Sequence, residues 1–250
     1  MTAPSLHNPH LDSNPFLLKG GSKAVLLIHG FTATPNEVRR LATNLTRAGF
    51  TTAGPLLPGH GSTPAALNKT RWQDWYLAVE KTCQELLEHY PKVIVGGESA
   101  GGLLALLLAA RIPGVSAVLA FAPALKIPMS KLQEIQLRLL APFVEGIPKD
   151  DLLGNTTWQG YTINPLKAVI QLRALQKTVR SELKKIHQPL LVLQGKKDTT
   201  IDQNSAELVY NGVSSIEKQI HWLEKSGHCL LLDNELHIAT HLTMDFLWKV

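Results

Sequence analysis

A single serine is framed by glycines in the segment Gly97-Glu98-Ser99-Ala100-Gly101. Residues 92–96 form a short apolar run typical of a buried strand, and residues 99–111 have the composition of a buried helix. A sharp strand-to-helix turn strains the backbone of the serine, and small residues two positions before and after it let neighbouring segments approach. The hydroxyl is then exposed above a helix N-terminus, where developing negative charge is stabilised. The pattern predicts a nucleophile at Ser99; the alternative is a glycine-rich turn before a core helix.

A serine nucleophile needs a base that accepts its proton. Residues 219–223 have the pattern of a strand, and His228 follows them in the loop Lys225-Ser226-Gly227-His228. By contrast, His221 lies inside that strand pattern, and His237 and His241 fall in the last helical segment. Because sites in parallel sheets form beyond the carboxyl ends of the strands, His228 is the expected base.

The base needs a carboxylate that orients it, and in this arrangement the acid lies between the serine and the histidine in the chain. Asp198 follows the strand pattern at 190–193 and is the favoured acid, although it could be an ordinary turn aspartate between flanking lysines. Asp202 is the fallback, and its alternative role is to cap the helix that follows.

An acyl-transfer site also needs two backbone N–H groups that stabilise an oxyanion. The amide of Ala100, directly after the serine, is one candidate. The loop Ile28-His29-Gly30-Phe31-Thr32 follows the first central strand and would supply the amide of Phe31 as the second. We expect His29 to have a structural role, and the glycine-rich loop at 58–62 to support the site architecturally.

Strand-length apolar runs alternate with segments of helical period, which predicts a mostly parallel sheet with helices on both faces. The expected strands are 16–18, 24–28, 51–54, 93–95, 115–121, 190–193 and 219–223, and the expected helices are 35–48, 71–90, 99–111, 203–211 and 234–248.

The alternation stops between Pro123 and Pro189, where we expect no strand and two amphipathic helices. The first covers 130–141, and Asn164 and Pro165 open the second as its N-cap and first residue. Residues 126–188 are therefore predicted to form a helical cap inserted into a core made of residues 1–125 and 189–250. Apolar residues at 132–147 would face the core as a roof. Met129, Trp158 and Tyr161 either line the substrate pocket or simply pack.

Composition excludes several classes of protein. Hydrophobic residues make up 44% of the 250 residues, which is enough for a packed core. The net charge of +5 is carried by scattered lysines and arginines, so we expect no nucleic-acid partner. The two cysteines are far apart and have no metal-like spacing, so neither a disulfide framework nor a zinc site is expected. The start of the chain lacks the pattern of a signal peptide, and no apolar run is long enough to span a bilayer, so we expect a cytoplasmic location. Oligomeric state is not indicated.

The chain resembles the α/β-hydrolases and, more narrowly, the small bacterial carboxylesterases and the related monoacylglycerol lipases. The resemblance runs over nearly the whole chain, through "NPFLLKGGSKAVLLIHGFTATPNEVRRLA", "PLLPGHGSTP", "WQDW", the Ser99 turn, Asn164-Pro165 and "WLEKSGHCLLLD". It implies an α/β fold with a small helical cap, a Ser99–Asp198–His228 triad, an oxyanion hole from Phe31 and Ala100, and no cofactor. One departure is Glu98, because the small family usually has an apolar residue before the serine.

The expected function is hydrolysis of short- to medium-chain carboxylic acid esters through an acyl-enzyme, with a small-molecule ester as substrate. A monoacylglycerol lipase is the first alternative. Another serine hydrolase of this fold, such as a carbon–carbon bond hydrolase or an amidase, would keep the triad and change the cap. A non-catalytic ligand-binding protein is also open, because one fold can serve unrelated functions.

Overall fold

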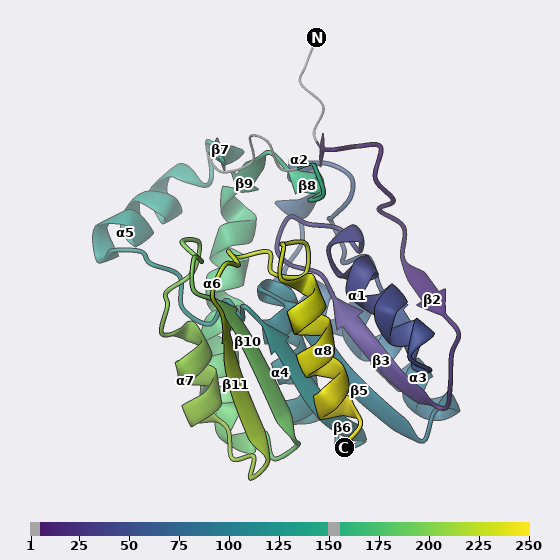
Figure 1. Ribbon diagram of the computed structural model, residues 1–250. Helices are drawn as coiled ribbons and strands as arrows, with labels where there is room; N and C mark the ends of the chain where they lie inside the picture. Colours follow the sequence, from purple (N-terminus) through teal and green to yellow (C-terminus); the bar gives the residue numbers. More distant parts are fainter. Residues whose placement is uncertain (1–5, 150–155) are drawn as a thin grey trace.

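The computed structural model describes residues 6–149 and 156–250. A seven-stranded sheet forms the centre, in the order β11-β10-β6-β5-β3-β4-β2 (Figure 1). All neighbouring strands are parallel except β2 and β4, which are antiparallel. Its strands are β2 (Phe16–Leu18), β3 (Lys23–Ile28), β4 (Thr51–Gly54), β5 (Lys92–Glu98), β6 (Val115–Phe121), β10 (Leu190–Gly195) and β11 (Lys218–Leu223).

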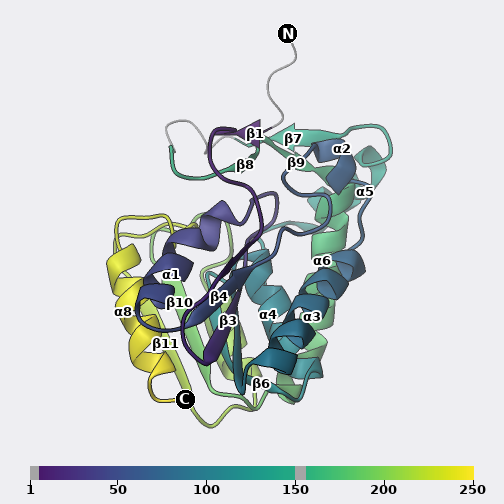
Figure 2. The ribbon, with the colours of Figure 1, turned by 90° about the vertical axis from the view of Figure 1, so that its right-hand side faces the viewer.

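Helices cover both faces of this sheet (Figure 2). Helices α1 and α8 pack together on one face. On the other face, α3, α4 and α6 contact one another, and α7 packs on β10 and β11. The helices on the two faces are α1 (Asn36–Arg47), α3 (Trp72–His89), α4 (Ala100–Arg111), α6 (Leu166–Glu182), α7 (Ser205–Gly212) and α8 (Leu236–Leu247). The predicted alternation of strands and helices is therefore confirmed.

Burial explains the continuous apolar runs. Strand β10 is buried along its whole length, and β3, β5 and β6 are buried except for one or two residues each, because helices cover both of their faces. Residues 100–109 of α4 are all buried as well. The two segments that meet at Ser99 are thus the central strand and the central helix of the core.

Short elements gather at one end of the sheet, uppermost in Figure 1. They are β1 (Leu6–His7), α2 (Pro64–Leu67), α5 (Lys131–Leu140), β7 (Gly146–Pro148), β8 (Gly160–Tyr161) and β9 (Ile163–Pro165), and the 3-10 helix η2 (Leu183–Lys185) follows α6. β1 pairs with β8 and β7 pairs with β9, both antiparallel.

Two expectations for this region are wrong. The stretch between Pro123 and Pro189 does contain strands, because β7, β8 and β9 each pair with another segment over two or three residues. Such short pairings depend on tertiary contacts and leave no periodic pattern. In addition, Pro165 rather than Asn164 is the N-cap of α6, because the pairing of Asn164 with Ile147 keeps Asn164 in extended backbone. The cap boundaries at 126 and 188 remain a prediction.

Candidate active site

Ser99 occupies the turn between β5 and α4 with φ +56° and ψ −113°, a backbone conformation that side-chain-bearing residues rarely adopt. The turn is held in place because the Ser99 N–H donates to the carbonyl of Phe121 on β6 at 2.9 Å. This strained conformation is the one expected of a serine that projects its hydroxyl from a strand-to-helix turn.

The flanking glycines are required by the close approach of backbone. A Cβ on Gly101 would lie 2.1 Å from the carbonyl oxygen of Ile28, and a Cβ on Gly97 would lie 2.4 Å from the carbonyl carbon of Gly101. A Cβ on Gly30 would come within 3.3 Å of the Cβ of Ser99. Strand β3, the turn and the start of α4 can therefore pack together only without these side chains.

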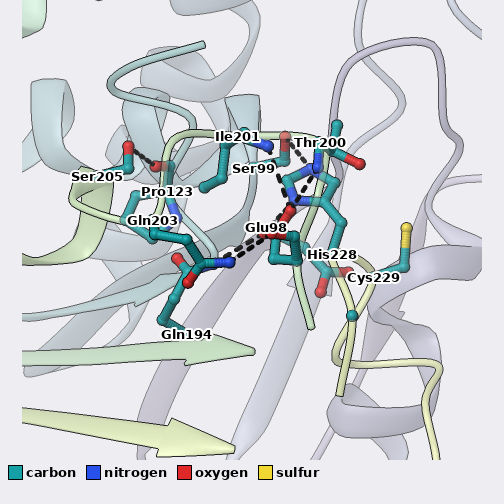
Figure 3. Close-up of polar contacts among 12 residues, drawn as sticks. Glu98, Ser99, Pro123, Gln194, Thr200, Ile201, Gln203, Ser205, His228 and Cys229 are labelled. Atoms are coloured by element: carbon teal, nitrogen blue, oxygen red, sulfur yellow. Dashed lines mark hydrogen bonds and ion pairs between the residues drawn. The ribbon is translucent and has the colours of Figure 1, made fainter. Parts of the chain in front are cut away.

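Three polar side chains from separate strand ends meet at this turn. The Oγ of Ser99 lies 2.9 Å from Nε2 of His228 (Figure 3). Nδ1 of the same imidazole lies 2.7 Å from Oδ2 of Asp198. The Asp198 side chain is fully buried, whereas 15% of the His228 side chain is exposed. Because Nδ1–H donates to the carboxylate, Nε2 is left as the acceptor for the serine hydroxyl.

The surroundings of Asp198 keep it ionised. Its Oδ1 accepts from the amides of Thr200 (2.9 Å) and Ile201 (3.2 Å), and its Oδ2 also accepts from Nε2 of Gln194 at 2.8 Å. Burial by itself raises the pKa of Asp198, but the hydrogen bond and charge of His228, together with the two amides, outweigh it and hold the pKa below its usual value. A charged carboxylate is therefore maintained beside His228.

The alternative residues lie elsewhere. Oδ2 of Asp202 pairs with Nζ of Lys126 at 2.7 Å, and its Oδ1 accepts from the amide of Asn204. The ring of His221 lies 3.3 Å from Gln219, and those of His237 and His241 interact locally within the last helical region. Of the weighed acids and bases, the structure brings only Asp198 and His228 to Ser99.

The loop after β3 packs against the serine turn. Within the described part of the chain, the backbone N–H groups of Phe31 and Ala100 donate to no other group of the protein. His29 lies behind them and is fully buried: its Nδ1–H donates to the carbonyl of Gly30 (2.9 Å), and its Nε2 accepts from the amide of Leu57 (3.1 Å). These bonds agree with the expected structural role of His29.

Sequence reasoning missed Glu37, a buried acid in the first turn of α1. Its Oε2 accepts from the Gly30 amide at 2.5 Å, and its Oε1 accepts from the indole N–H of Trp158 at 3.1 Å. Glu37 therefore fixes the residue directly before Phe31. Its position looks like that of an ordinary helix-start glutamate, so no sequence pattern distinguishes it. Gln194 was missed as well, although a polar residue in an apolar strand was an available signal.

The three pocket candidates make the following contacts. Met129 is half-buried against the cluster of Leu137, Ala141 and Leu166. Trp158 is almost buried, with Nζ of Lys149 over its ring. Tyr161 is completely buried; its hydroxyl donates to the carbonyl of Gly59 (2.6 Å) and accepts from the amide of Ser62 (3.0 Å). Its hydroxyl thus ties strand β8 to the loop at 58–62.

The apolar stripe of the cap does not face the core, contrary to expectation. Phe143 is 88% exposed and Leu139 is 67% exposed. Leu132, Ile135, Leu140, Val144 and Ile147 are exposed as well. The reason is that α5 packs mainly against α6, and of its residues only Leu137 is buried.

Two further properties bear on the class of site. Within residues 6–149 and 156–250, no three His, Cys, Asp or Glu side chains come together as a metal site. In the same ranges no helix combines the length and the apolar character needed to span a bilayer.

Comparison with known proteins shows which family the chain belongs to. The model of the serine aminopeptidase S33 family (Hydrolase_4) matches residues 21–235. The carboxylesterase of Bacillus subtilis (strain 168) is 32% identical over 243 residues, 94% of this chain and 96% of that protein. The thermostable monoacylglycerol lipase of Bacillus sp. (strain H-257) is 29% identical over 237 residues, 95% of each chain.

A solved structure of a lipolytic enzyme has the same fold. The structure reported for the metagenome-derived lipolytic enzymes LipS and LipT superimposes with a TM-score of 0.88 at 28% identity, covering 95% of this chain and 98% of that one. The predicted α/β-hydrolase fold is confirmed by this likeness and by the parallel sheet. Since the family model spans most of the chain, the protein belongs to the serine aminopeptidase S33 family of hydrolases.

Proposed function

We propose that the protein is a serine carboxylesterase that hydrolyses short- to medium-chain carboxylic acid esters through an acyl-enzyme intermediate. The observation that carries this proposal is the unbroken hydrogen-bonded chain from Asp198 through His228 to Ser99, with distances of 2.7 Å and 2.9 Å. The similarity to a carboxylesterase and a monoacylglycerol lipase supports an ester bond as the target.

In the proposed mechanism, Nε2 of His228 takes the Ser99 proton as Oγ attacks the ester carbonyl. The amides of Phe31 and Ala100, which have no other acceptor in the described part of the chain, hold the oxyanion. The protonated His228 then gives its proton to the leaving alcohol, and a water molecule repeats the sequence to release the acid. Asp198 stays ionised and keeps the imidazole tautomer fixed.

The cap supplies the acyl pocket in this proposal. Residues 126–188 would cover the site, and Met129, Trp158 and Tyr161 would contribute to its lining. Trp158 gives the most direct support for a lining role. Its indole N–H donates to Glu37, which in turn binds the loop that carries Phe31, here called the oxyanion loop. A cytoplasmic location is part of the same proposal and is supported by the two free cysteines, Cys83 and Cys229.

The test combines covalent labelling with turnover. We expect a fluorophosphonate to label the wild-type protein at Ser99, and chromogenic acetate and butyrate esters to be hydrolysed. S99A should bind no label and lose at least about 10⁴-fold in kcat while its circular dichroism is unchanged. Undiminished turnover by S99A would remove Ser99 from the mechanism.

A monoacylglycerol lipase is the second candidate, favoured by the relative of that name. The two functions separate on a series of esters with acyl chains of increasing length. A carboxylesterase should show its highest kcat/KM on short and medium chains, whereas a monoacylglycerol lipase should prefer glycerol monoesters of longer acids. A preference for emulsified long-chain triacylglycerols would contradict both.

A further inference from the structure

Glu98 directly precedes the nucleophile and is completely buried. Its Oε1 accepts the backbone N–H of Leu231 at 3.0 Å, and Leu231 lies three residues after His228 (Figure 3 shows Glu98 beside the histidine). One side chain therefore joins the turn that carries the serine to the loop that carries the imidazole.

Other carboxylates also hold the histidine loop. Asp233 accepts from the Gly227 amide at 2.8 Å, and Glu235 accepts from the Lys225 amide at 2.7 Å. Both acids belong to the same stretch of chain as the histidine, so they shape the loop without fixing its distance from the serine. Glu98 comes from the serine turn, so its hydrogen bond bears directly on the distance between Oγ and Nε2.

The second oxygen of Glu98 has unusual surroundings. Oε2 is buried and has no hydrogen-bond partner among the described residues, whereas both oxygens of Asp198 accept hydrogen bonds. A charged oxygen in such a place would lose its hydration without compensation. A neutral carboxylic acid avoids this cost.

The neighbouring acidic groups also favour the neutral, protonated form of Glu98. Burial, then the charge of Glu37 on α1, and then that of Asp198 raise the pKa of Glu98; together they outweigh the backbone amides of Leu231 and Leu230, which lower it, and leave the pKa well above its usual value. Cys229, on the histidine loop, is a further titratable group that interacts with this carboxyl. The cation Lys149 interacts with Glu37 and Cys229.

We propose that Glu98 is a positioning residue that acts as an uncharged acid, holding the histidine loop against the nucleophile turn, and that its ionisation as the pH rises inactivates the enzyme. This inference rests on the proposed esterase function. When the proton leaves Oε2 for solvent hydroxide, an unpaired negative charge arises beside Glu37 and Asp198. Repulsion and the missing hydrogen-bond donor then favour displacement of the carboxyl, and the 2.9 Å contact between Ser99 and His228 lengthens. The loss falls on kcat rather than on KM, because the proton transfer is impaired.

The test compares E98Q with the wild-type enzyme. The glutamine oxygen can still accept from Leu231, but the side chain cannot ionise. K149Q is the matched control, because burial lowers the pKa of Lys149 to about 8, so that its titration falls inside the pH range of the assay. kcat and KM for a chromogenic butyrate are measured from pH 6.5 to 10, with S99A as the blank for spontaneous hydrolysis, and each profile is normalised to its own maximum.

We expect the wild-type kcat to fall about tenfold per pH unit above a midpoint and to recover when the pH is lowered again. E98Q should stay within about twofold of its maximum over that range, while K149Q keeps the wild-type fall. The proposal is overturned if the wild-type profile is flat, if E98Q falls as the wild type does, or if K149Q removes the fall.

A spectroscopic measurement decides the matter if E98Q does not fold. Wild-type and E37Q proteins carrying ¹³C-labelled glutamate should both show the infrared band of a protonated carboxyl group at pH 6.5, and the band should vanish over the interval in which kcat falls. E37Q is needed because burial raises the pKa of Glu37 as well, and this variant removes its contribution to the band. Absence of the band contradicts a neutral Glu98. If the wild type neither labels with a fluorophosphonate nor hydrolyses esters at pH 7, the esterase proposal fails, and the infrared band then still tests the charge state of Glu98.

Discussion

Replacing Gly101 by alanine tests how tightly the serine turn is packed. The new Cβ would lie 2.1 Å from the carbonyl oxygen of Ile28, and real Cβ contacts are essentially never under 3.0 Å. The backbone at the end of β3 must therefore move by about 1 Å. Such overpacking typically costs about 1–3 kcal/mol, of which alanine's better helix propensity returns up to about 1 kcal/mol.

The same displacement should reduce activity more than stability. Ile28 directly precedes the loop that carries Phe31, and a misplacement of about 1 Å can cost about 10²-fold in rate. We therefore expect G101A to unfold about 2–8 °C below the wild type and to show a kcat about 10²-fold lower on a chromogenic butyrate. Differential scanning calorimetry and steady-state kinetics measure the two quantities.

Gly102 provides the matched control on the same helix. A Cβ there would lie 3.1 Å from the carbonyl oxygen of Gly97 and 3.5 Å from Pro123, so a shift of a few tenths of an ångström accommodates it. G102A should thus lose much less of both properties than G101A. Equal effects of the two substitutions, or a G101A enzyme with wild-type kcat and Tm, would refute the steric argument.

Three further predictions concern single side chains. D198N should lower kcat about 10⁴-fold with little change in KM on the same ester, because the amide favours the wrong imidazole tautomer. A loss of kcat below tenfold would contradict the role given to Asp198. Y161F should destabilise the protein by about 1–3 kcal/mol in urea unfolding, because the Gly59 carbonyl and the Ser62 amide lose the hydroxyl that binds both. Unchanged stability would show that water replaces the hydroxyl. Burial lowers the pKa of His29 from 6.5 to about 4, so the unfolded state binds its proton first and about 3 kcal/mol of stability is lost as pH falls from 6.5 to 4. Over this interval the unfolding free energy of the wild type should therefore fall by about 3 kcal/mol more than that of H29N, and equal losses would contradict the assignment.

The core of the fold could be predicted because its signals are local. Central strands such as β10 are buried on both faces, so they appear as unbroken apolar runs, and α1 and α3 begin and end within one residue of the expected limits. The short strands of the cap could not be predicted in this way. The pairing of β1 with β8 joins residues about 150 positions apart, and no propensity of two residues encodes it.

The same distinction applies to the candidate site. Ser99, Asp198 and His228 are recognisable because each follows a strand and has a side chain suited to one chemical role. Glu37 and Gln194 bind the oxyanion loop and the acid through contacts that depend on how α1 and β10 pack. The exposure of Phe143 was missed because an apolar stripe indicates which residues share a face, whereas only the tertiary structure decides what covers that face.

The bond between Trp158 and Glu37 has a consequence for how members of this family can diverge. In the described chain, the hydrogen bonds that join Ser99, His228 and Asp198 arise from strand ends of the central sheet, whereas the loop after β3 is also braced, through Glu37, by the indole of Trp158. If the proposed mechanism holds, a lineage that rebuilds the segment around Trp158 to admit a new alcohol or acid would leave proton transfer untouched and alter how well the carbonyl is polarised. Selectivity and turnover would then evolve together from one half of the active site, while the other half stays as it is.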